Sequence, residues 1–254
     1  MSRPRRTRIR THTPDAAPRG GRPVASAAEV PQLLRLLHLA SPALPIGAFH
    51  FSQGLEYAVE AGWVHDEASA LEWIGGIAQA SLATLDLPVL YRLHTAWARA
   101  DHAAVLRWNA FLMACRETDE LRLEDRHLGA ALLRVLAEFE LTTGLFPVGA
   151  PNIREAVTHA TVFGFACARW HIDPLAALQT YAWAWAENQV LAAVKLVPLG
   201  QSAGQRMLHS LNAGLGSYSV RAMEVLDSDI GISTVLQSVA SGRHETQYTR
   251  LFRS

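Results

Sequence analysis

Apolar residues recur at every third or fourth position along most of this chain, which is the spacing of one face of an α-helix. The first stripe begins near Val30, and others follow through most of the sequence. Asp66, Asp101 and the pair Asp173-Pro174 stand directly before stripes, where a carboxylate caps a helix and proline suits its first position. No segment alternates apolar and polar residues as a half-buried strand does. The pattern predicts one all-α domain, a single bundle of about eight to ten helices over residues 29–241.

Four stretches lack this periodicity. Residues 1–28 are rich in Arg and Pro and almost free of large apolar side chains, so we expect a disordered N-terminal tail. Residues 41–52 are punctuated by Pro and Gly, which favours a loop. Residues 216–240 are ambiguous. Residues 242–254 are polar and aromatic without a stripe, so we expect a C-terminal tail that orders only on a partner.

Composition narrows the class of protein. The 254 residues are 50% apolar and 18% charged, with 23 basic and 23 acidic side chains. Seven arginines fall within residues 1–23, which leaves the predicted helical domain mildly acidic and argues against a nucleic-acid partner. Only two cysteines are present, which favours a reducing, cytoplasmic compartment. The sequence contains no run of about 18 apolar residues, so no membrane span is predicted.

Recognisable catalytic and metal-binding motifs are weak. The only lysine, Lys195, follows Val194 rather than Gly, which excludes a P-loop nucleotide site. Residues 200–204 match the G-x-S-x-G pattern around Ser202, so a serine hydrolase is the alternative function. That motif works between a strand and a helix, and no strand is predicted here. The eleven histidines show no metal-ligand spacing, and we expect no bound metal or cofactor.

Two charged segments have more than one interpretation. Residues 115–125, CRETDELRLED, hold five acids and two arginines, which favours a surface ladder of ion pairs; burial across a helix interface is the alternative. Residues 181–195 carry Glu187, Asn188, Gln189 and Lys195 among aromatic residues and alanines. They form either a cap or surface edge, or a polar seam at an interface or passage.

Four blocks of sequence together resemble the UreF family of urease accessory proteins, in family order and across residues 30–254. They read SPALPIGAFHFSQGLEYAVEAGWV (41–64), RETDELRLEDRHLG (116–129), AWAWAENQVLAAVKLVPLGQSAGQRML (182–208) and RHETQYTRLFRS (243–254). The chain departs from the family pattern at His50 and over residues 216–240, and residues 1–28 lie outside the resemblance.

The resemblance implies an all-helical, non-enzymatic protein that acts in cytoplasmic nickel delivery to apo-urease. Proteins of this family form homodimers, bind UreD (also called UreH) and recruit the GTPase UreG, whose GTP hydrolysis they are proposed to regulate. No nucleic-acid or membrane partner is implied. A nickel-storage protein that uses the scattered histidines is a further alternative.

The resemblance also assigns three groups of partner-binding residues. GTPase-facing or tunnel-facing groups are Lys195, Gln201, Gln205 and Arg206. Tail residues that dock on UreD or UreG are Arg243, His244, Glu245, Tyr248, Arg250, Phe252 and Arg253. A second contact is an exposed loop with Phe49, Phe51 and Gln53, backed by Glu56 and Tyr57. Packing or capping within the chain is the alternative for each.

Overall fold

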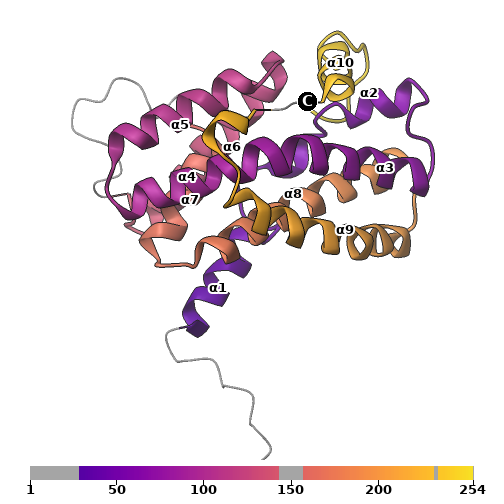
Figure 1. Ribbon diagram of the computed structural model, residues 1–254. Helices are drawn as coiled ribbons and strands as arrows, with labels where there is room; N and C mark the ends of the chain where they lie inside the picture. Colours follow the sequence, from indigo (N-terminus) through magenta and orange to yellow (C-terminus); the bar gives the residue numbers. More distant parts are fainter. Residues whose placement is uncertain (1–28, 143–156, 232–233, 254) are drawn as a thin grey trace, which may run out of the picture.

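The computed structural model describes residues 29–142, 157–231 and 234–253, and within these ranges the chain forms helices and no strand (Figure 1). The all-α prediction is therefore confirmed. The expected N-terminal tail, residues 1–28, lies outside the described residues. The helices are α1 (Glu29–Ala40), α2 (Leu55–Glu60), α3 (Glu67–Ile77), α4 (Leu87–Ala98), α5 (His102–Cys115), α6 (Asp119–Glu138), α7 (His159–Arg169), α8 (Pro174–Leu196), α9 (Gln201–Ala222) and α10 (Val235–His244).

The core is built from α4, α7, α8 and α9. Helix α4 packs along α7, and α8 packs along α9, while α6 covers the other side of α7. Gly129 on α6 permits that last contact, because a Cβ atom there would lie 2.1 Å from the carbonyl oxygen of Val157. Asp66, Asp101 and Asp173 cap α3, α5 and α8 through their side chains, as their positions predict.

A π-helical segment, Ala78–Asp86, joins α3 to α4, so that residues 67–98 form one continuous helical run. This run is the one described helix that is long and apolar enough to cross a membrane, and 61% of its most apolar window is buried inside the protein. It is therefore a core helix of this fold. The π-helical segment also turns Ser81 and Asp86 toward a cavity described below.

The loop before α2 is shaped by two glycines. Gly47 and Gly54 have φ angles of 78° and 85°, a left-handed conformation that costs glycine little. A Cβ atom on Gly54 would also lie 2.9 Å from the backbone nitrogen of Ser241, so α10 packs directly on this turn. Between them, Phe51 turns inward and is 1% exposed. Its predicted exposure is therefore wrong, because the two turns direct it into the core.

The C-terminal region is more ordered than its sequence suggests. Helix α9 runs to Ala222, a short 3-10 helix spans Asp227–Asp229, and α10 follows. The boundary expected between residues 241 and 242 falls inside α10. Residues 245–253 then return to lie against α2 and the loop before it.

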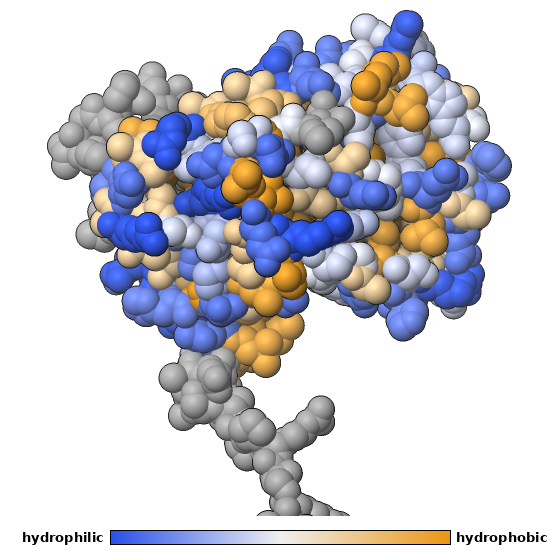
Figure 2. Space-filling model, viewed as in Figure 1, coloured by the Kyte–Doolittle hydropathy of each residue, from blue (hydrophilic) through white to orange (hydrophobic). Residues whose placement is uncertain are grey.

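Helix α1 projects from one edge of the bundle (Figure 1). Its stripe of leucines does not enter the core: Leu33, Leu34 and Leu37 are each 57–60% exposed. An orange patch marks this helix and a second marks α10 in Figure 2.

Candidate functional site

The side chain of His244, at the C-terminal end of α10, lies between two carboxylates. Its Nε2 atom is 3.0 Å from Glu56 of α2, and its Nδ1 atom is 2.9 Å from Glu120 of α6. His244 is 0% exposed, and both glutamates are buried. Arg250 adds a cation, 3.1 Å from Glu120. We call Glu56, Glu120, His244 and Arg250 the clasp.

The clasp also fixes the backbone of the tail. The backbone nitrogens of Leu251 and Phe252 donate to the two oxygens of Glu56, at 2.6 and 2.8 Å. The amide of Arg253 donates to the carbonyl oxygen of His50 at 2.7 Å. Glu245 accepts from the backbone nitrogens of Asp119 and Glu120, the first turn of α6, where a helix favours negative charge. Residues 245–253 are thus anchored to α2, α6 and the 47–54 loop.

Lys195 joins this site from the end of α8. Its ammonium lies 5.9 Å from the ring centre of Phe49 and 5.8 Å from that of Phe252. A cation over aromatic faces gains about 0.5–1 kcal/mol at an exposed position. Three residues that sequence reasoning assigned to different groups therefore meet at one place.

Around the clasp, large apolar side chains face outward. Tyr248 is 103% exposed and Leu251 68%, while Val235 and Leu236 on α10 are 76% and 61% exposed. These residues, together with Val239, define what we call the α10–tail surface. Large apolar side chains exposed together on a helix and on the segment that follows it are typical of an interaction site.

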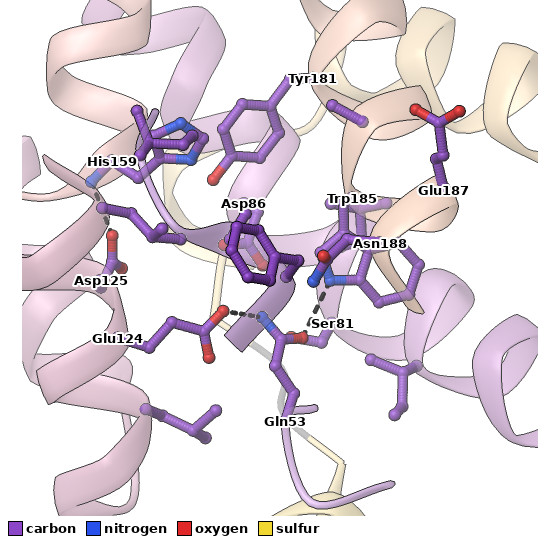
Figure 3. Close-up of a pocket in the computed structure, with 18 of the residues that line it drawn as sticks. Gln53, Ser81, Asp86, Glu124, Asp125, His159, Tyr181, Trp185, Glu187 and Asn188 are labelled. Atoms are coloured by element: carbon purple, nitrogen blue, oxygen red, sulfur yellow. Dashed lines mark hydrogen bonds between the residues drawn. The ribbon is translucent and has the colours of Figure 1, made fainter. Parts of the chain in front are cut away.

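A cavity of about 130 Å³ lies beside the 47–54 loop, between α6, α8 and the π-helical segment (Figure 3). It has room for several water molecules. Gln53 spans its rim: its amide donates to Glu124 at 2.8 Å and its carbonyl accepts from the Trp185 indole at 2.9 Å. Asn188 of α8 reaches the carbonyl oxygen of Phe51 at 3.3 Å. The cavity and the tail thus share the same loop.

Buried charges form the inner wall of the cavity. Arg116 contacts Asp86 at 2.5 Å and Asp125 at 2.8 Å, and its side chain is 16% exposed. Burial raises the pKa of Asp86 despite the attraction of Arg116. Burial also lowers the pKa of His159 to about 4, so that its imidazole is neutral at pH 7. Segment 115–125 is accordingly buried across a helix interface at Arg116, Glu120, Glu124 and Asp125. The predicted surface ladder is wrong there.

Three further side chains present polar atoms to the cavity. Ser81 and Tyr181 line the cavity and are over nine-tenths buried. Glu187 is half-buried, and burial raises its pKa. Of the polar residues on α8, Glu187 and Asn188 therefore line a cavity, while Gln189 faces the core and Lys195 faces solvent.

The remaining candidate residues lie apart from the clasp. Gln201, Gln205 and Arg206 are exposed on the first turns of α9, and Arg206 pairs with Glu67 of α3 at 2.6 Å. Tyr57 packs edge-on against Trp63. Arg243 is exposed on α10.

The structure does not support the alternative function of a serine hydrolase. Ser202 is exposed in the first turn of α9, after a loop rather than a strand. Asp227 and His244, an acid and a histidine that follow Ser202 in the order Ser…Asp…His typical of such hydrolases, are engaged elsewhere: Asp227 pairs with Arg92, and His244 lies within the clasp. Among the described residues, no group of three or more His, Cys, Asp or Glu side chains is placed to hold a metal ion.

Glu120 and the acidic residues that line the cavity were not predicted from the sequence as functional residues. The available signal was the density of charge in segment 115–125, which exceeds what one solvated helix face usually needs. Its interpretation depended on partners such as Asp86 and His244 that lie far away in the sequence.

The fold and site define an all-helical protein that holds a C-terminal tail against its own body and exposes apolar surface around it. Comparison with known proteins agrees with the sequence blocks. The family model of UreF matches residues 64–212. Curated relatives called urease accessory protein UreF include that of Alkalilimnicola ehrlichii, 47% identical over 221 residues, which are 87% of this chain and 95% of the relative. That of an Azoarcus species is 48% identical over 224 residues, with the same coverage of each chain.

The chain therefore belongs to the UreF family of urease accessory proteins. The resemblance inferred from the four sequence blocks is confirmed.

Proposed function

We propose that this protein is a non-enzymatic cytoplasmic scaffold in nickel delivery to urease, which binds UreD (UreH) and recruits and regulates the GTPase UreG. The observation that carries the proposal is the α10–tail surface. On the tail, Tyr248 and Leu251 are exposed on a segment whose backbone amides donate to Glu56, and the Glu245 side chain joins that segment to the first turn of α6. A rigid apolar surface loses little conformational entropy on binding, which favours a stable protein partner.

We assign the α10–tail surface to UreD. Tyr248 supplies a large aromatic anchor, and Arg250 and Arg253 supply the planar cations that are frequent at interface centres. The exposed polar groups at the junction of α8 and α9 are assigned to UreG. These are Lys195, Gln201 and Gln205, with Arg206 held in place by Glu67.

We further propose that the cavity takes nickel as cargo. Five carboxyl groups line it, from Asp86, Glu117, Glu124, Asp125 and Glu187. A divalent cation is attracted by such a wall. The lack of a complete ligand set among the described residues suits passage rather than storage. Glu187→Gln should therefore slow nickel-dependent urease activation without changing helical content, whereas unaltered activation would contradict passage here.

The homodimer is assigned to α1. Leu33, Leu34 and Leu37 form an exposed apolar stripe on a projecting helix. Helices bury such stripes against another helix, and a second copy offers a matching one.

Light scattering of the purified chain, alone and with UreD and UreG, tests these assignments together. Leu236→Glu on α10 should abolish co-elution with UreD and leave the dimer intact, and Leu34→Glu should do the reverse. Leu226→Glu is the matched control, because Leu226 is 65% exposed but precedes the 3-10 helix rather than lying on α10. Retention of UreD by Leu236→Glu would contradict the docking surface. A wild-type chain that binds neither partner would contradict the scaffold function.

A further inference from the structure

The clasp places one imidazole between two acceptors. A carboxylate only accepts hydrogen bonds, so each contact of Glu56 and Glu120 with His244 is a hydrogen bond only if the ring nitrogen carries a proton. A neutral imidazole has one N–H group and one lone pair, and can satisfy only one of them. The protonated ring has two N–H groups and satisfies both. The observed geometry is therefore that of an imidazolium.

The surrounding charges agree with this protonation state. The groups facing His244 are Glu56 from α2 and Glu120 from α6, and Arg250 of the tail pairs with Glu120. With the ring protonated, these four charges balance. On α10 itself, His244 lies in the last turn, where a helix favours a cation. Its neighbours Arg243 and Glu245 are both exposed and carry opposite charges.

We propose that the clasp is a proton-dependent latch, which holds residues 245–253 on the body while His244 is protonated and loosens them when His244 releases its proton to solvent. Loss of the proton leaves a lone pair of the ring facing a buried carboxylate. Relief requires one of the two acids to separate from the ring. Both acids also bind the tail, Glu56 through the amides of Leu251 and Phe252 and Glu120 through Arg250, so displacing either acid weakens the docking of the tail. The inference concerns this chain alone and goes beyond its proposed role as a scaffold.

The direction of the pH effect follows from the ring's environment. Burial lowers the pKa of His244, but the hydrogen bonds and charges of Glu120 and Glu56 outweigh it, so the pKa lies above the ordinary value of 6.5 for histidine. A group with a raised pKa stabilises the docked tail fully below pH 6.5. That contribution is lost as pH rises from 6.5 through the raised pKa. Within this window the docking constant falls by up to about tenfold per pH unit, the limit for one released proton.

Hydrogen–deuterium exchange of the full-length protein, followed by mass spectrometry, tests the latch. The exchange rate of the peptide covering residues 245–253 is measured from about pH 6 to pH 9. After correction for intrinsic exchange, it gives the equilibrium constant for opening of the tail. A peptide from α8 in the same protein serves as the internal reference. We expect opening of the tail to be constant below pH 6.5 and to rise by up to about tenfold per pH unit above it. Opening that does not depend on pH would overturn the proposal.

Two variants separate the latch from general stability. His244→Gln carries a neutral side chain at every pH, so its tail should be more open than the wild type at low pH and show no pH dependence. His209→Gln, at an exposed histidine of α9, should behave as the wild type. A pH dependence that persists in His244→Gln would assign the effect to another group. If His244→Gln does not fold, an NMR titration of the wild-type imidazole decides, because a His244 pKa below 6.5 would exclude the latch.

Discussion

His244 and Gln189 are both completely buried, and each has an exposed fraction of 0%. Both ring nitrogens of His244 have charged partners, which come from α2 and α6. The side-chain nitrogen and oxygen of Gln189 have no hydrogen-bond partner within the described part of the chain. One buried polar group thus joins three segments, whereas the other lies in the core without compensation.

The difference shows that burial alone does not make a polar residue important for stability. A buried polar group costs about 1–3 kcal/mol when it is unpaired. A buried charge whose partner is removed costs more, because the remaining charge stays in a medium that solvates it poorly. Substitutions at the two sites should therefore change the free energy of unfolding in opposite directions, lowering it at the clasp and raising it at Gln189.

The largest effect is expected for Glu56→Ala. The change leaves His244 with one carboxylate and removes the acceptor of two tail amides. We expect the free energy of unfolding to fall by about 3–5 kcal/mol, as for other broken buried ion pairs. Urea denaturation followed by circular dichroism measures it. Glu60→Ala is the matched control, because Glu60 lies at the exposed end of the same helix.

A loss below about 1 kcal/mol, similar to that of a surface pair, would contradict the role of Glu56 as the anchor of the clasp. A large loss in Glu60→Ala as well would assign the effect to α2 as a helix rather than to the clasp.

A smaller effect of opposite sign is expected for Gln189→Met. Methionine has a similar length and shape and removes both unpaired polar atoms. We expect the free energy of unfolding to rise by about 1 kcal/mol, measured by the same denaturation. Gln205→Met on the exposed face of α9 should leave stability unchanged. Destabilisation by Gln189→Met would show that bound water satisfies the amide and that the two sites are alike.

The helices could be predicted because their causes are local. The caps at Asp66, Asp101 and Asp173 and the stripes between them depend on residues within a few positions of one another. The inward turn of Phe51 could not, because it depends on left-handed conformations at Gly47 and Gly54 and on the contact of Gly54 with α10.

The clasp could be predicted only in part. The resemblance assigned Glu56, His244 and Arg250 to partner binding, but it did not show that they bind one another. Glu56 and His244 are 188 positions apart, and no periodic pattern connects residues at that separation. The predicted surface ladder of segment 115–125 is wrong for the same reason. Asp86 pairs with Arg116, and His244 pairs with Glu120, only in the folded chain.

Lys195 provides the smallest expected change in stability and the clearest separation of stability from function. It lies on the same helix as Gln189 but is exposed, and its ammonium lies over the rings of Phe49 and Phe252. Lys195→Ala should therefore lower the free energy of unfolding by no more than about 1 kcal/mol. If its ammonium faces UreG as proposed, urease activation and co-elution with UreG should fall sharply while UreD binding is kept. Lys195→Arg preserves the cation over the rings and should retain most of the activity. Normal activation by Lys195→Ala would show that this lysine only supports the tail, and a loss of UreD binding would place its role in holding Phe252 rather than in contacting the GTPase.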